Sequence, residues 1–266
     1  MQLMYMKPFE TFVLLSLMVL STIATCGCQE RADYGKDEGA VGGAVVSSNV
    51  ELQSGNRTYP AYLAMPEGEG PWPGIVLLHS FGGLNAGYRN MTDKLAAEGY
   101  VVITPEWLTF DRPTDAVMEA IVRDSVRFLE ERDDVNADLL GLTGSCAGGR
   151  YTMLFLPQIQ EFDSGVAFYG FPYRESTANE TAPAGYIDEL DDPMLIIHGT
   201  ADKASNVTDI YRYATDLDAA GKYFEMKIYQ GEPHEFMLTE EDELSDSFVA
   251  QDAFWQMATF FERTLK

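Results

Sequence analysis

The stretch Leu139-Leu-Gly-Leu-Thr-Gly-Ser-Cys-Ala-Gly-Gly149 decides the fold of this chain. Residues 139–143 form a short, largely apolar run, which is typical of a strand buried on both faces of a parallel sheet. Gly144 then allows an abrupt turn, and a helix is expected from Ala147 onward. A strand that passes through a tight turn directly into a helix indicates an α/β fold.

The same alternation of strand and helix continues on both sides of this stretch. Further strands are expected at residues 74–79, 100–104, 164–169, 194–198 and 223–229. Helices are expected at residues 89–98, 115–132, 205–220 and 248–265. Two extended stretches, at residues 50–53 and 59–65, precede them. The sequence therefore predicts a mostly parallel central sheet with helices on both faces, led by antiparallel strands.

Charge is the unusual feature of the composition. The chain has 42 acidic and 18 basic residues, a formal net charge of −24, and 46% hydrophobic residues. So much apolar material predicts a sizeable core, while the negative charge and the absence of any Lys/Arg cluster exclude a nucleic-acid partner. Carboxylates spread over the whole chain suggest adaptation to high salt, where their repulsion is screened.

The N-terminal segment resembles an export signal. Lys7 precedes an apolar run at residues 12–20, which small residues and then Cys26 and Cys28 follow. We expect a signal or lipoprotein-like leader at residues 1–28, a polar linker at 29–44 and one folded domain at 45–266. The protein is then extracellular or at the cell surface, with Cys26 or Cys28 as lipidation candidates for membrane attachment through the N-terminus. An ordinary cleaved signal with incidental cysteines is the alternative.

The sharpest chemical signal is the tight turn around Cys146. A strand that enters a helix through Gly144-Ser-Cys-Ala-Gly148 has the context of a nucleophile elbow, G-x-S-x-G, with cysteine at its centre. The turn exposes the central side chain above the sheet edge, and the positive end of the following helix favours the thiolate form. A buried structural cysteine in a tight turn is the alternative.

Two later residues complete a candidate triad. Asp202 follows the strand at 194–198, and His234 follows the strand at 223–229, which gives the order nucleophile, acid, histidine. Each is expected just beyond the carboxyl end of its strand, where open α/β sheets build their sites. His234 would take the thiol proton and Asp202 would orient it. Of the two other histidines, His198 is expected to pack in the core or bond to backbone, and His79 to shape the loop after its strand.

Other residues are candidates for binding rather than for covalent chemistry. The backbone N–H groups of Phe81 and Ala147 are candidate oxyanion donors, because both follow strand ends. Ser80, Trp107, Arg112 and Phe236 are candidate pocket residues, although the two aromatic ones could equally be core. The spacing of His, Cys and carboxylates fits no metal-site pattern, so neither a metal nor another cofactor is expected.

With these motifs the chain resembles the dienelactone hydrolase family over residues 50–266. The likeness rests on residues 75–86 and 95–105, on the cysteine elbow at 144–149, and on His198-Gly-Thr-Ala-Asp202 and His234-Glu-Phe236. The resemblance implies an α/β-hydrolase fold and ester or lactone hydrolysis. It also implies the triad Cys146, Asp202 and His234, with oxyanion donors at Phe81 and Ala147.

Two departures from the family concern the substrate. Ser80 stands where dienelactone-hydrolysing members have a glutamate that interacts with the resting thiol. Leu238 stands where they have one of the arginines that hold the substrate carboxylate, and Arg112 lies near the position of the other, but offset. We therefore expect a small ester or lactone other than dienelactone, and the acidic composition argues against an anionic one.

Two functions from other classes remain as alternatives. One is a surface-anchored binding protein on a hydrolase scaffold without turnover, since a fold does not fix a function. The other is a redox or metal-handling lipoprotein that uses Cys26 and Cys28. Hydrolysis of a small-molecule ester is the favoured interpretation. The sequence does not indicate an oligomeric state.

Overall fold

The computed structural model describes residues 43–176 and 180–266, which belong to one compact unit. Its strands are β1 (Val45–Ser54), β2 (Arg57–Pro66), β3 (Trp72–Leu78), β4 (Val101–Pro105), β5 (Val135–Ser145), β6 (Ser164–Phe168), β7 (Met194–Gly199) and β8 (Phe224–Tyr229). Its α-helices are α1 (Ala86–Ala97), α2 (Asp115–Glu130), α3 (Ala147–Phe155), α4 (Val207–Ala219) and α5 (Phe248–Leu265). A 3₁₀ segment, η1 (Pro183–Glu189), lies between β6 and β7.

The strands form one sheet in the order β1-β2-β4-β3-β5-β6-β7-β8. β1 pairs antiparallel with β2 and β2 with β4, whereas all pairs from β4 to β8 are parallel. The predicted α/β fold, with a mostly parallel sheet led by antiparallel strands, is confirmed.

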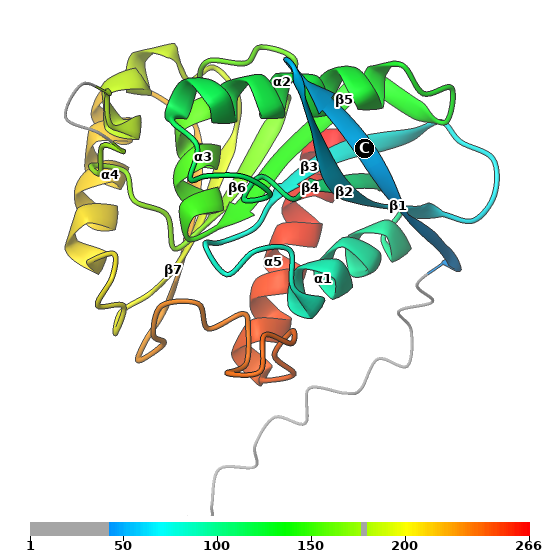
Figure 1. Cartoon of the computed structure of the whole chain (residues 1–266). Coiled ribbons are helices and arrows are strands. Elements are labelled where there is room, and N and C mark those ends of the chain that lie inside the picture. Colours follow the sequence, from blue (N-terminus) through cyan, green and yellow to red (C-terminus); the bar gives the residue numbers. More distant parts are fainter. Residues whose placement is uncertain (1–42, 177–179) are drawn as a thin grey trace, which may run out of the picture. The chain divides into compact units, whose positions relative to one another are not determined.

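Helices cover both faces of this sheet (Figure 1). One core cluster joins the sheet to α2, α3 and α4 through residues such as Ile121, Phe155 and Ile210. The other joins it to α1 and α5 through Tyr88 and Met257. The parallel strands β3 to β7 are therefore buried on both sides, which is why they read as apolar runs.

The strand order reverses direction between β3 and β5. From β3 the chain moves outward to β4 on one side, and from β5 it continues through β6, β7 and β8 on the other. Such a switch point leaves a crevice beyond the carboxyl ends of the two strands, where open α/β sheets bind ligands. Loop 79–85 follows β3 at this edge, and Cys146 follows β5.

Several helix boundaries differ from the prediction by one to three residues, and the largest difference is at the start of α1. α1 begins at Ala86 rather than at residue 89, because the Asn85 side chain accepts a hydrogen bond from the Tyr88 N–H at 3.2 Å and caps the helix. The leader, the linker up to residue 42, Cys26 and Cys28 lie outside the described residues. Among the described helices, none is both long enough and apolar enough to span a bilayer.

Candidate active site

Cys146 occupies a strained turn between β5 and α3. Its φ is 57° and its ψ is −112°, a left-handed conformation that few non-glycine residues adopt. The turn is tight because α3 packs directly on the backbone of β3: a Cβ on Gly148 would collide with the Leu78 carbonyl. The Cys146 N–H donates to the Phe168 carbonyl at 3.1 Å, which ties the turn to β6.

The loops after β7 and β8 bring a carboxylate and an imidazole to this cysteine. His234 Nδ1 donates to Asp202 Oδ2 at 2.7 Å. The other carboxylate oxygen, Asp202 Oδ1, accepts from the N–H groups of Ala204 and Ser205, both at 2.8 Å. Cys146 Sγ, a carboxylate oxygen of Glu235 and a His234 ring nitrogen lie within 4.8 Å of one another. The three residues that the sequence predicts as a triad thus meet at one point.

The surroundings set opposite charges on His234 and Asp202. Burial on its own lowers the pKa of His234, but the hydrogen bond to Asp202 and the neighbouring Cys146 raise that pKa to about 9. Burial raises the pKa of Asp202, yet the hydrogen bonds from His234 and Ser205 hold it below its usual value. Asp202 is therefore a carboxylate that stabilises a protonated imidazole.

The other two histidines have structural partners. His198 is fully buried, and its Nε2 donates to the Ser205 carbonyl at 3.0 Å, in agreement with the predicted core position. His79 Nδ1 donates to the Ser80 carbonyl at 2.7 Å, and its Nε2 lies 3.1 Å from Glu106 Oε1. Because Glu106 also accepts from the Leu84 N–H at 2.8 Å, His79 shapes the loop after β3, as expected.

The predicted oxyanion donors lie on opposite sides of the switch point. Phe81 belongs to the loop after β3, and Ala147 is the first residue of α3. Both line the same cavity. Within residues 43–176 and 180–266, neither backbone N–H donates to a backbone carbonyl outside its own element. The two groups are thus free to bind a negatively charged oxygen.

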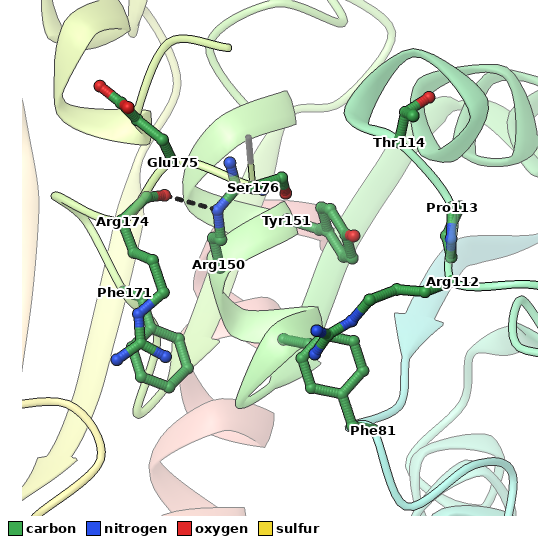
Figure 2. A pocket seen from close by; sticks show the side chains of 11 residues that line it. Phe81, Arg112, Pro113, Thr114, Arg150, Tyr151, Phe171, Arg174, Glu175 and Ser176 are labelled. Carbon is green, nitrogen blue, oxygen red and sulfur yellow. Dashed lines mark hydrogen bonds between the residues drawn. The ribbon is translucent and has the colours of Figure 1, made fainter. Parts of the chain in front are cut away.

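The cavity next to the elbow has a volume of about 310 Å³; Ala147, the residue after Cys146, lines it, whereas Cys146, Asp202 and His234 are not part of its lining. Three arginines surround it, and Figure 2 shows how they lie: Arg112 covers the Phe81 ring, Arg174 covers the Phe171 ring and Arg150 stands between them. The guanidinium carbons of Arg112 and Arg174 are 3.6 and 3.7 Å from those ring centroids. Aromatic rings therefore hold two exposed positive charges at the cavity wall.

Arg150 has a structural role in this wall. Its two terminal nitrogens donate to Asp115 of α2 at 2.8 and 2.7 Å, and its Nε donates to the Arg174 carbonyl at 2.7 Å (Figure 2). The Ser176 hydroxyl also donates to Asp115, at 2.7 Å. This buried, bidentate pair fixes the segment that carries Arg174 against α2 and α3.

The four residues predicted for the pocket lie in different environments. Arg112 lines the cavity. Trp107 is instead fully buried between His79 and Tyr151, because its ring stacks on the imidazole with centroids 4.7 Å apart. Ser80 and Phe236 are also buried, and they stand outside the cavity lining. For Trp107 and Phe236 the core position that was the alternative is the one observed.

Some residues of the site were not predicted from the sequence. Arg150 lies one helical turn after Cys146, at spacing i, i+4, so the elbow itself could have indicated that it faces the same region. Glu235 follows the candidate base directly and has a φ of 58°, which turns the chain sharply after His234. No sequence pattern indicates that its carboxylate approaches the cysteine.

Comparison with known proteins places this arrangement in a family. Residues 59–265 match the profile of the Dienelactone hydrolase family. Protein usf of Aquifex pyrophilus is 27% identical over 81% of this chain and 98% of its own. A candidate carboxymethylenebutenolidase of Methylorubrum extorquens is 26% identical over 72% of each chain, and a candidate 2-oxo-3-(5-oxofuran-2-ylidene)propanoate lactonase of Bradyrhizobium is 25% identical over 70% of this chain and 82% of its own.

A solved structure agrees with the fold. The crystal structure of a candidate dienelactone hydrolase from Klebsiella pneumoniae superposes with a TM-score of 0.75 at 24% identity, over 83% of this chain and 99% of the other. At this identity the likeness shows the α/β-hydrolase fold. The profile match covers most of the chain, and so the protein belongs to the dienelactone hydrolase family.

Proposed function

We propose that the protein hydrolyses small esters or lactones with Cys146 as the nucleophile, His234 as the proton carrier and Asp202 as its orienting carboxylate. The observation that carries the proposal is the convergence of these three side chains beside a cavity of about 310 Å³. Family membership supports hydrolysis of a lactone or ester. The strained turn supports the choice of nucleophile, because strain of this kind is concentrated at active sites.

The first half of the reaction forms an acyl-enzyme. The Cys146 thiolate attacks the carbonyl carbon, and the electron pair of the C=O bond moves to oxygen. The N–H groups of Phe81 and Ala147 stabilise this oxyanion. When it collapses, the C–O bond to the alcohol breaks and His234 gives its Nε2 proton to the leaving oxygen. The product is a thioester on Cys146 and a neutral His234.

The second half releases the acid. Neutral His234 accepts a proton from water as the water oxygen attacks the thioester carbonyl. Collapse of the second oxyanion breaks the C–S bond and regenerates the thiolate beside a protonated imidazole. The pKa of His234, raised to about 9 by Asp202 and Cys146 despite its burial, suits this resting pair. No cofactor takes part in either half.

The cavity favours a substrate with a negative charge, although the whole chain is acidic. Arg112 and Arg174 stand at the cavity wall together with one carboxylate, Glu175, and Arg112 forms no ion pair with any residue of the described ranges. Local charges a few ångströms away outweigh distant screened ones. We therefore revise the expectation from composition and propose a carboxylate on the substrate.

Hydrolysis of short-chain p-nitrophenyl esters and simple lactones tests the nucleophile. The full-length protein should turn these substrates over, and Cys146→Ala should abolish turnover while the protein remains folded. The matched control is Cys26→Ser with Cys28→Ser, which leaves Cys146 as the single cysteine and should keep full activity. Unchanged activity in Cys146→Ala excludes this nucleophile. A folded wild type without activity on a broad panel favours the non-catalytic binding protein.

Paired substrates test the charge of the cavity. The ratio of kcat/KM for a monomethyl dicarboxylate over its dimethyl ester should fall about 10-fold in Arg112→Gln, which is what one charge-assisted hydrogen bond at a partly exposed site contributes. Arg57→Gln is the matched control, since Arg57 also covers a phenylalanine ring, Phe110, outside the cavity lining. An equal ratio in both variants excludes a role for Arg112 in selecting a carboxylate.

Export rests on the sequence of the leader. We propose that the chain is exported and that Cys26 or Cys28 carries a lipid that attaches the protein to a membrane. Mass spectrometry of the native N-terminus tests this: a diacylglyceryl-modified cysteine at the new N-terminus supports it, whereas an unmodified terminus after cleavage supports an ordinary signal.

A further inference from the structure

Cys146, His234 and Glu235 present three different metal-ligand atoms to one small volume. A sulfur, a ring nitrogen and a carboxylate oxygen lie within 4.8 Å of one another. Thiolate, imidazole and carboxylate are the three side-chain ligands that Zn²⁺ takes in proteins. Three protein ligands with an open fourth position are also the usual composition of a zinc site that keeps a water or another exchangeable ligand.

The orientation of His234 fits a metal ligand. Its Nδ1 is bonded to Asp202, so Nε2 is the nitrogen that remains available. Nε2 is buried, and the group that it faces is the Cys146 thiol. Zinc-bound histidines characteristically give their other ring nitrogen to a carboxylate, which fixes the ring and makes it a better ligand. Asp202 is held for this by the N–H groups of Ala204 and Ser205.

The electrostatic surroundings favour a cation at this point. Two anionic ligands and the net charge of −24 would both lower the free energy of a bound divalent ion.

We propose that Cys146, His234 and Glu235 bind a zinc-type divalent cation, and that the bound ion reversibly inhibits hydrolysis. The thiolate sulfur, His234 Nε2 and a Glu235 oxygen each donate an electron pair to the ion. The one proton that the cysteine and histidine share is released to solvent, and nothing is oxidised or reduced. The inhibition rests on the proposed function, because the bound ion would occupy the nucleophile and the base together. The binding of the ion does not rest on the proposed function.

Cobalt(II) absorption tests binding without any measurement of turnover. The full-length protein with Cys26→Ser and Cys28→Ser contains one cysteine, so a thiolate-to-Co²⁺ charge-transfer band reports Cys146 alone. We expect the band to appear on titration and to disappear when Zn²⁺ is added. Cys146→Ser in this background should have no band. If the variant that keeps Cys146 shows no charge-transfer band at millimolar Co²⁺, the proposal is overturned.

Two variants at Glu235 test the third ligand. Glu235→Gln keeps the shape of the side chain, and Glu235→Gly also relieves the positive φ of 58°, so it is expected to fold at least as well. Both should weaken Co²⁺ binding by about 10-fold or more, the loss that follows even from disturbing an outer partner of a metal ligand. Glu240→Gln removes an equal charge from an exposed position in the same loop and should bind like the wild type. Equal affinities in all three variants overturn the assignment of Glu235.

Zinc inhibition separates this proposal from the proposed function. In an active protein, Zn²⁺ should inhibit ester hydrolysis at concentrations about 10-fold lower than those needed for Glu235→Gly, which loses one ligand. A protein that shows the cobalt band but hydrolyses no ester keeps the metal site and loses the esterase. A protein that hydrolyses esters, resists millimolar Zn²⁺ and shows no band supports the proposed function and overturns the metal site.

Discussion

At the scale of single residues, the two carboxylate oxygens of Asp202 have different roles. Oδ2 accepts from His234 Nδ1, while Oδ1 accepts from the N–H groups of Ala204 and Ser205 and so closes the loop after β7. The Asp202 side chain is fully buried, which strengthens its interaction with the imidazolium. The orientation of His234 and the shape of the loop therefore depend on the same side chain.

Asp202→Asn separates these roles. The amide oxygen can still accept from the loop N–H groups, but the side chain no longer carries the charge that stabilises protonated His234. We expect kcat/KM to fall by about 10²–10⁴-fold, in the range known for triads that lose this charge. The melting temperature should change much less than in Asp202→Ala. Near-wild-type hydrolysis by Asp202→Asn would contradict the role given to this residue.

At the scale of elements, the contact between α3 and β3 determines where Cys146 stands. Gly148 lies on the first turn of α3, directly over the carbonyl of Leu78 at the end of β3. The obstacle that a Cβ would meet is backbone in a central strand, which cannot move aside as a side chain can. The glycine thus sets the distance between Cys146 and the loop that carries Phe81.

Gly148→Ala should therefore damage both stability and activity. We expect a loss of about 3 kcal/mol in the free energy of unfolding, the upper end of the range for overpacking. Urea denaturation measures it. Gly43→Ala is the control, because the nearest atom to a Cβ there is 3.9 Å away, an ordinary contact. A Gly148→Ala variant as stable as the control would contradict the close packing of α3 on β3.

Asp192, two residues before β7, is a partly buried carboxylate that the negative charge of Asp163 repels. Burial, together with the charge of Asp163, raises the pKa of Asp192 from 3.8 to about 6. The folded state therefore binds a proton that the unfolded state has already lost, so stability falls as the pH rises from about 4 through 6 and remains low above that. This is a cost of ionising Asp192 in the fold.

Asp192→Asn removes that cost. At pH 8 the variant should be more stable than the wild type by about 1 kcal/mol, allowing for solvent screening at a partly exposed site. For a domain of this size the corresponding rise in melting temperature is about 2–4 °C. The gain should vanish below pH 4, where Asp192 is protonated in both states. Melting curves across this range check the sign, and a gain that persists at pH 3 would contradict the assignment.

At the scale of the whole molecule, repulsion among carboxylates dominates the electrostatics. With a net charge of −24, the compact state should gain stability as salt screens this repulsion. We expect the melting temperature to rise by several degrees between low salt and 1 M NaCl, where the screening length is about 3 Å. Most of the rise should occur below about 0.5 M, because screening saturates there. A melting temperature independent of NaCl would argue against adaptation to high salt.

The sequence by itself determined the fold class, the cysteine elbow and the three residues expected to act together. Apolar runs and glycine turns are local signals, and Cys146, Asp202 and His234 each follow a predicted strand within a few residues. The helix at residue 86 was placed three residues late because a cap depends on one side-chain hydrogen bond, that of Asn85. The burial of Trp107 could not be predicted from the sequence either, since an aromatic residue suits a core and a pocket equally.

Only the tertiary structure decided which charges reach the site. Arg174, which follows β6, and Arg112, which precedes α2, become neighbours of one cavity through folding, and the proposal of a carboxylate on the substrate rests on them. Glu235 approaches Cys146 from a loop almost ninety positions away in the chain, so no spacing rule for metal ligands applies to it. The physical reason is common to both: charge and coordination act over a few ångströms in space, and sequence patterns record only distance along the chain.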